Sequence, residues 1–133
     1  MSLGYVDSSS VLAIILGERR HERVERELRR FDVGVSNGLM EAKIRAALHR
    51  EGFPETDPEG FPTVIEWIHP DRPLSLEISR ALEAGHLKGA DLLHVATALF
   101  ARQATDGALS FLTLDESQRR VAAELGFDTP ELG

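Results

Sequence analysis

The sequence has no cysteine, which excludes disulfide bonds, cysteine-ligated zinc, iron–sulfur clusters and thiol nucleophiles. It also lacks a long apolar run. The longest one, Val11–Leu16, is far shorter than the roughly 20 residues that a bilayer requires, and no basic segment precedes it. We therefore expect no membrane span, no secretion signal and a cytoplasmic location.

The remaining composition is ordinary for a globular protein. Of the 133 residues, 42% are hydrophobic and 28% charged, so we expect a single domain over residues 1–133. The 22 acidic residues outnumber the 15 lysines and arginines, and the net charge is -7. Such a surface repels polyanions, which argues against a protein that coats nucleic acid. An enzyme that touches nucleic acid at a small site, or a protein with a basic partner, remains compatible with this charge.

Short apolar stretches alternate with helical patterns along the chain. Strands are predicted at Gly4–Val6, Asp32–Ser36, Thr63–Ile68 and Leu109–Leu114, and helices at Val11–Leu16, Glu18–Arg30, from Asn37 to about Arg50, at Ser75–Ala84 and Ala90–Gln103, and from Asp115 to near Gly126. This alternation predicts a three-layer α/β/α sandwich with a central, mainly parallel sheet. Ligands bind such sheets at the carboxyl ends of the strands. The segment Glu51–Pro62 is rich in proline and glycine and is predicted to be a loop, whose role the sequence leaves open.

Two acidic residues follow predicted strands directly. Asp7 comes after the first strand and Asp115 after the last, so both are expected at the same edge of the sheet. Each also suits a helix N-cap. For Asp115 this alternative is strong, because Gln118 stands three residues later, as in a capping box. For Asp7 it is weaker, because any of the serines at 8–10 could cap the helix instead.

Two further carboxylates lie on helices. Glu41 precedes Ile44 and Leu48 by three and seven residues, which predicts a carboxylate on the apolar stripe of its helix. Burial of that charge requires a partner, which could be an arginine or a metal ion. Asp91 opens the strongest helical segment, where the helix dipole alone could explain a negative charge. Together the four acids predict an oxygen-rich site for one or two Mg²⁺ or Mn²⁺ ions.

Four segments carry a resemblance to a known family. They are Tyr5–Ser9, Ser36–Glu41, Leu87–Leu99 and Phe111–Asp115. In this order they resemble the successive motifs of the PIN domain, and most closely those of the VapC-like toxins of toxin–antitoxin pairs. The resemblance implies a metal-dependent endoribonuclease with an acidic site formed by Asp7, Glu41, Asp91 and Asp115. It further implies hydroxyl support from Ser9 and Thr113, an RNA substrate, an inhibiting antitoxin protein and a homodimer.

Other polar residues are less informative. The five histidines show no metal-ligand spacing, and His94, inside the strongest helix, is interpreted as a packed or hydrogen-bonded residue. Lys43, Arg45 and Lys88 flank the acidic motifs and are candidates for contacts with substrate phosphates, although solvated surface residues are the commoner outcome. Two alternatives stay open: a catalytically inert PIN-like interaction module, and a PIN nuclease that acts in RNA processing rather than as a toxin.

Overall fold

A central sheet of four parallel strands organises the protein. The computed structural model describes residues 2–52 and 65–132, so most of the loop expected at Glu51–Pro62 lies outside the described residues. The strands lie in the order β3-β2-β1-β4. Their bounds are β1 Leu3–Val6, β2 Val33–Asn37, β3 Ile65–Ile68 and β4 Ser110–Leu112. All three pairings are parallel, with Tyr5 opposite Val35 on one side and Phe111 on the other.

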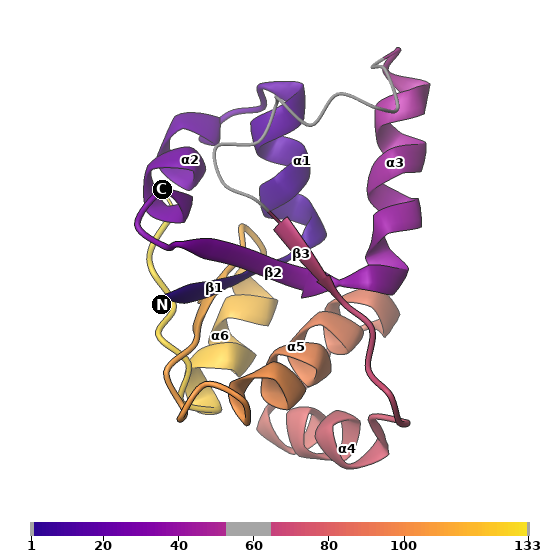
Figure 1. Ribbon diagram of the computed structural model, residues 1–133, viewed down its shortest axis with the longest axis vertical. Coiled ribbons are helices and arrows are strands. Elements are labelled where there is room, and N and C mark those ends of the chain that lie inside the picture. Colours follow the sequence, from indigo (N-terminus) through magenta and orange to yellow (C-terminus); the bar gives the residue numbers. More distant parts are fainter. Residues whose placement is uncertain (1, 53–64, 133) are drawn as a thin grey trace.

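Helices cover both faces of this sheet (Figure 1). On one face lie α1 Ser8–Leu16, α2 His21–Leu28 and α3 Glu41–Arg50, the last preceded by the 3-10 turn η1 Gly38–Met40. On the other lie α4 Ser75–Ala84, α5 Gly89–Arg102 and α6 Glu116–Glu124. Each face has its own apolar core: Val6 and Leu112 point into the first, and Tyr5 and Phe111 into the second. The predicted three-layer sandwich is confirmed.

The order of the strands creates a switch point beside β1. The chain proceeds outward from β1 to β2 and β3, and then crosses back to add β4 on the opposite side of β1. The chain therefore leaves the carboxyl end of β1 towards α1 on one face of the sheet, and the carboxyl end of β4 towards α6 on the other face. In open parallel sheets, the crevice at such a point is where ligands bind.

The expected elements are present with small changes of boundary. Helix α4 has the predicted bounds, whereas β4 is shorter than the predicted strand Leu109–Leu114. Beyond α6, Asp128 forms an isolated parallel bridge with Ser110 of β4. None of the helices that the structure describes is long and apolar enough to cross a membrane.

Candidate active site

Asp7 lies at the carboxyl end of β1, where it is almost fully buried. It is the N-cap of α1: its Oδ1 accepts a hydrogen bond from the backbone N–H of Ser10 at 3.0 Å. The cap is therefore the aspartate and not one of the serines that follow it. The hydroxyl of Ser9 donates to both carboxyl oxygens, at 2.9 and 2.8 Å. Burial raises the pKa of Asp7 even though these hydrogen bonds act in the opposite direction.

Thr113, just beyond β4, joins Asp7 to the start of α6. Its hydroxyl lies 2.6 Å from Oδ2 of Asp7 and 2.7 Å from Oε1 of Gln118, and it accepts from the backbone N–H of Asp115 at 3.0 Å. The Thr113 hydroxyl is therefore shared between the carboxyl group of Asp7 and the side-chain amide of Gln118.

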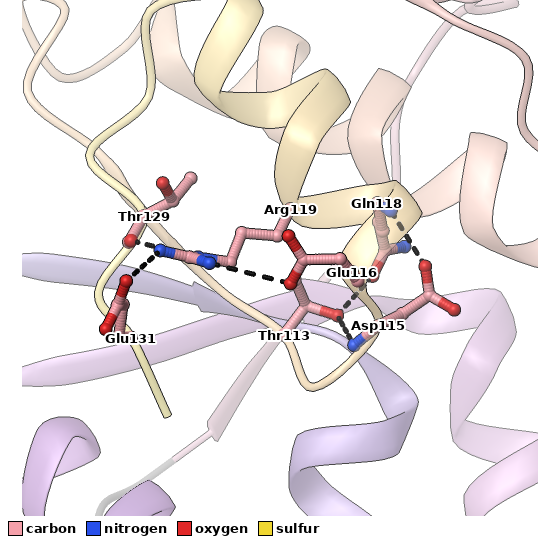
Figure 2. Close-up of polar contacts among 7 residues, drawn as sticks. All are labelled: Thr113, Asp115, Glu116, Gln118, Arg119, Thr129 and Glu131. Atoms are coloured by element: carbon pink, nitrogen blue, oxygen red, sulfur yellow. Dashed lines mark hydrogen bonds and ion pairs between the residues drawn. The ribbon is translucent and has the colours of Figure 1, made fainter. Parts of the chain in front are cut away.

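Asp91 and Asp115 lie at the starts of two helices, close enough for the charge of Asp115 to act on Asp91. Asp115 caps α6 by accepting from the backbone N–H of Gln118 at 2.7 Å, as Figure 2 shows. Asp91 lies in the first turn of α5. Partial burial raises the pKa of Asp91, repulsion from Asp115 raises it further, and the positive charge of Lys43 lowers it. Two carboxylates and one exposed lysine therefore influence one another at this edge.

Glu41 is placed differently from the expectation. It is the first residue of α3, and its side chain is 41% exposed instead of buried on the apolar stripe with Ile44. One of its oxygens lies 3.6 Å from Nη1 of Arg45. Of the two partners that the sequence left open, an arginine is the one that the structure shows. Lys88, at the N-cap position of α5, is exposed, and its carbonyl accepts from the N–H of Leu92.

A buried histidine connects α5 to the β1–α1 turn. The N–H of Ser8 donates to Nε2 of His94 at 3.3 Å, and the Ser8 hydroxyl lies 2.9 Å from the same atom. Nε2 is therefore the acceptor, so Nδ1 carries the proton and donates to the hydroxyl of Tyr5 at 2.7 Å. Burial, with a smaller contribution from nearby Lys43, lowers the pKa of His94 to about 4. His94 is thus neutral at pH 7 and holds the residues on either side of Asp7.

Arg119, although close to this edge, is already paired with acidic side chains. Figure 2 shows its guanidinium between Glu116 and Glu131, at 3.5 and 3.3 Å, with a third contact to the carbonyl of Thr129. It ties α6 to the segment that follows. The positive charge of Lys43, in contrast, reaches Asp91.

The carboxylate oxygens at this edge are suitable ligands for a hard divalent ion, but the side chains are not arranged as a complete coordination site. Over residues 2–52 and 65–132, no three aspartate, glutamate or histidine side chains are grouped closely enough to hold one ion together. Mg²⁺ is usually held by one or two carboxylates and completes its shell with water and substrate phosphates. Asp91 and Asp115 are the two carboxylates available for such binding. Asp7 is connected to them through the hydroxyl of Thr113.

Local sequence patterns contain no direct signal for the residues that link these acids. Gln118 was expected only as part of a capping box, yet its side chain reaches α5. The contacts of His94 with Tyr5 and Ser8 span 89 and 86 residues, so no local pattern encodes them.

Comparison with known families agrees with this geometry. The model of the PIN domain family matches residues 4–124, which include all four strands, all six helices and the four predicted acids. Searches of curated proteins and of solved structures give no significant match. Since the match covers nearly the whole chain and the fold is a parallel α/β/α sandwich with acids at its carboxyl edge, the chain belongs to the PIN domain family, whose fold is of the nuclease type.

Proposed function

We propose that the protein is a divalent-metal-dependent endoribonuclease that hydrolyses RNA phosphodiesters at the carboxyl edge of its sheet. The acids of the site are Asp7, Glu41, Asp91 and Asp115. The observation that carries the proposal is the meeting of Asp7, Asp91 and Asp115 around two buried side chains at the switch point of the sheet. Three carboxylates from distant segments are costly to bring together, which is typical of a site that binds a cation.

Each group of the site has a task in this proposal. Bound Mg²⁺ or Mn²⁺ supplies charge neutralisation at the scissile phosphate and a more acidic water. Asp91 and Asp115 are the partly exposed ligands, and the buried Asp7, oriented by Ser9 and Thr113, completes the site. Glu41, at the rim with Arg45, orients the attacking water. Lys43 and Lys88 attract substrate phosphates, and Lys43 already acts on Asp91.

As its biological role we propose the toxin of a toxin–antitoxin pair, acting as a homodimer and inhibited by an antitoxin protein. Support comes from the resemblance of the four motifs to VapC-like toxins and from the net charge of -7, which suits a basic partner. A nuclease of RNA processing would use the same acids. The two roles differ in the RNA that is cut and therefore in the effect on the cell. Expression of a toxin without its antitoxin should stop growth, whereas expression of a processing enzyme should not.

The test is cleavage of a mixed RNA pool with Mg²⁺, with Mn²⁺ and with EDTA. Asp91→Asn and Asp7→Asn should each reduce the metal-dependent rate by ~100-fold or more, as loss of a group that stabilises transition-state charge does. The matched control is Asp106→Asn, which changes an exposed aspartate between α5 and β4, away from the carboxyl edge. Equal cleavage by Asp91→Asn and Asp106→Asn would refute the proposal and would reveal a contaminating nuclease.

A specific observation favours a second candidate, an inert PIN-like interaction module. Both Asp7 and Asp115 are helix N-caps, and no described group of three side chains is arranged for a metal ion. In this reading the acids are structural. Titration with Mn²⁺ by calorimetry separates the candidates, because the nuclease should bind the ion and lose binding in Asp91→Asn, and the module should bind none.

A further inference from the structure

We infer that Gln118 is a positioning residue, which sets the relative placement of Asp7, Asp91 and Asp115. This inference rests on the function proposed above. Gln118 is the third residue of α6 and is fully buried, which is uncommon for glutamine and requires that its amide be hydrogen-bonded.

The contacts of Gln118 reach all three acids. Its Nε2 donates to the backbone carbonyl of Asp91 at 3.0 Å, its Oε1 lies 2.7 Å from the Thr113 hydroxyl, and its own N–H donates to the Asp115 carboxylate at 2.7 Å. Figure 2 shows the last two contacts converging between β4 and α6. Through Thr113 the contact extends to Asp7. The side chain of Gln118 thus joins α5 to the residue that follows β4, and its backbone N–H holds the carboxylate of Asp115.

The side chain is available for this task because it is not used in the cap. In a capping box, the residue three positions after the N-cap would bond back to the N–H of the N-cap residue. Here the hydroxyl of Thr113 accepts from that N–H of Asp115 instead. The amide of Gln118 is thereby released to cross from α6 to the first turn of α5, where Asp91 lies.

The cross-link matters because the two helices begin from unrelated loops. The start of α5 follows α4, whereas the start of α6 follows β4, so no continuous backbone fixes the distance from Asp91 to Asp115. The like charges of Asp91 and Asp115 repel each other. The two bonds of the Gln118 amide oppose that separation in the absence of an ion. Groups that orient ligands in this way commonly change metal affinity by ~10- to 100-fold when removed.

The test compares two changes within α6. Gln118→Met keeps the volume of the side chain but removes both amide bonds. Val121→Ala is the control: it is a buried residue one turn later, and its loss weakens packing without touching the acids. Mn²⁺ affinity is measured by calorimetry without RNA, beside Tm and the kinetics of RNA cleavage. Gln118→Asn, which keeps an amide but is too short to span both partners, replaces the methionine variant if that variant does not fold.

We expect Gln118→Met to bind Mn²⁺ at least ~10-fold more weakly than the wild type. Its kcat should fall while KM for RNA stays within about twofold, because the groups that contact RNA are unchanged. Val121→Ala should lower Tm and keep its Mn²⁺ affinity. The inference is wrong if Gln118→Met binds Mn²⁺ as tightly as the wild type, or if Val121→Ala loses as much affinity. Failure of the wild type itself to bind Mn²⁺ would instead overturn the proposed function.

Discussion

The hydroxyl oxygen of Thr113 lies 2.6 Å from Oδ2 of Asp7, although 106 residues separate them in the sequence. The contact connects the ends of β1 and β4, which are neighbours in the sheet. It also gives the buried carboxyl of Asp7 a polar partner in a place that water does not reach.

Replacement of Thr113 should reveal the importance of that hydroxyl. Thr113→Val keeps the shape but leaves Asp7, Gln118 and the N–H of Asp115 without their shared partner, so we expect a loss of ~2–3 kcal/mol in the free energy of unfolding. Thr113→Ser keeps the hydroxyl and should lose only about 1 kcal/mol, for one buried methyl group. Urea denaturation measures both. Equal losses for the two variants would mean that the hydroxyl contributes little.

Asp7 should show a separation of stability from function. Its pKa is raised in the folded state, so folding at pH 7 carries the cost of a buried charge, and this cost grows as the pH rises above the unfolded-state value. Asp7→Asn removes the charge and retains an acceptor for the N–H of Ser10. We expect its unfolding free energy without metal to equal or exceed that of the wild type. Asp7→Ala, which removes the cap, should lose ~1–2 kcal/mol. A clear loss in Asp7→Asn would contradict this interpretation.

His94 should make the protein sensitive to mild acid. Its pKa is about 4 in the folded protein, below the ordinary value of 6.5 for histidine, so the unfolded chain takes up a proton first. The contribution of neutral His94 to the free energy of unfolding is therefore fully present above pH 6.5 and is lost as the pH falls towards 4. Its upper limit is ~3 kcal/mol. The free energy of unfolding is measured against pH for the wild type and for His94→Gln. The carboxylates contribute equally to both profiles, so the difference between the profiles isolates the effect of His94. Parallel profiles between pH 4 and 6.5 would rule it out.

The ion pair of Arg72 and Glu77 should stabilise α4 far from the site. Two hydrogen bonds, at 3.0 and 2.7 Å, join the guanidinium to the buried carboxylate, and they lower the pKa of Glu77 to about 2. Since this pKa is depressed, the contribution is present above pH 4.5 and disappears as the pH falls to 2.

Arg72→Met leaves the carboxylate of Glu77 without its cation and with only the contact to Gln103 among the described side chains, so we expect the free energy of unfolding at pH 7 to fall. The double change Arg72→Met with Glu77→Leu should recover most of that loss, since the unpaired charge is gone. RNA cleavage should be unaffected in both variants. A double variant no more stable than Arg72→Met would show that packing, and not the charge, determines the effect.

Local patterns predicted the elements of the fold well, and the contacts within the site poorly. Helices α4 and α5 are recognisable because their apolar spacing repeats and Gly85 follows the first of them. The inward orientation of Glu41 was wrong because its helix begins at that residue, where the side chain can turn outward to Arg45. That Gln118 would reach α5 depends on how two distant helices pack, and sequence periodicity carries no such information.

The parallel arrangement also fixes when the carboxyl edge can exist during synthesis. Asp7 leaves the ribosome before Asp91, but Thr113 and Gln118 complete the hydrogen bonds around them only when β4 and α6 have been made. A nascent chain that ends before α6 therefore contains all four described strands but lacks the finished edge. Any activity that depends on this edge can appear only after α6 has left the ribosome.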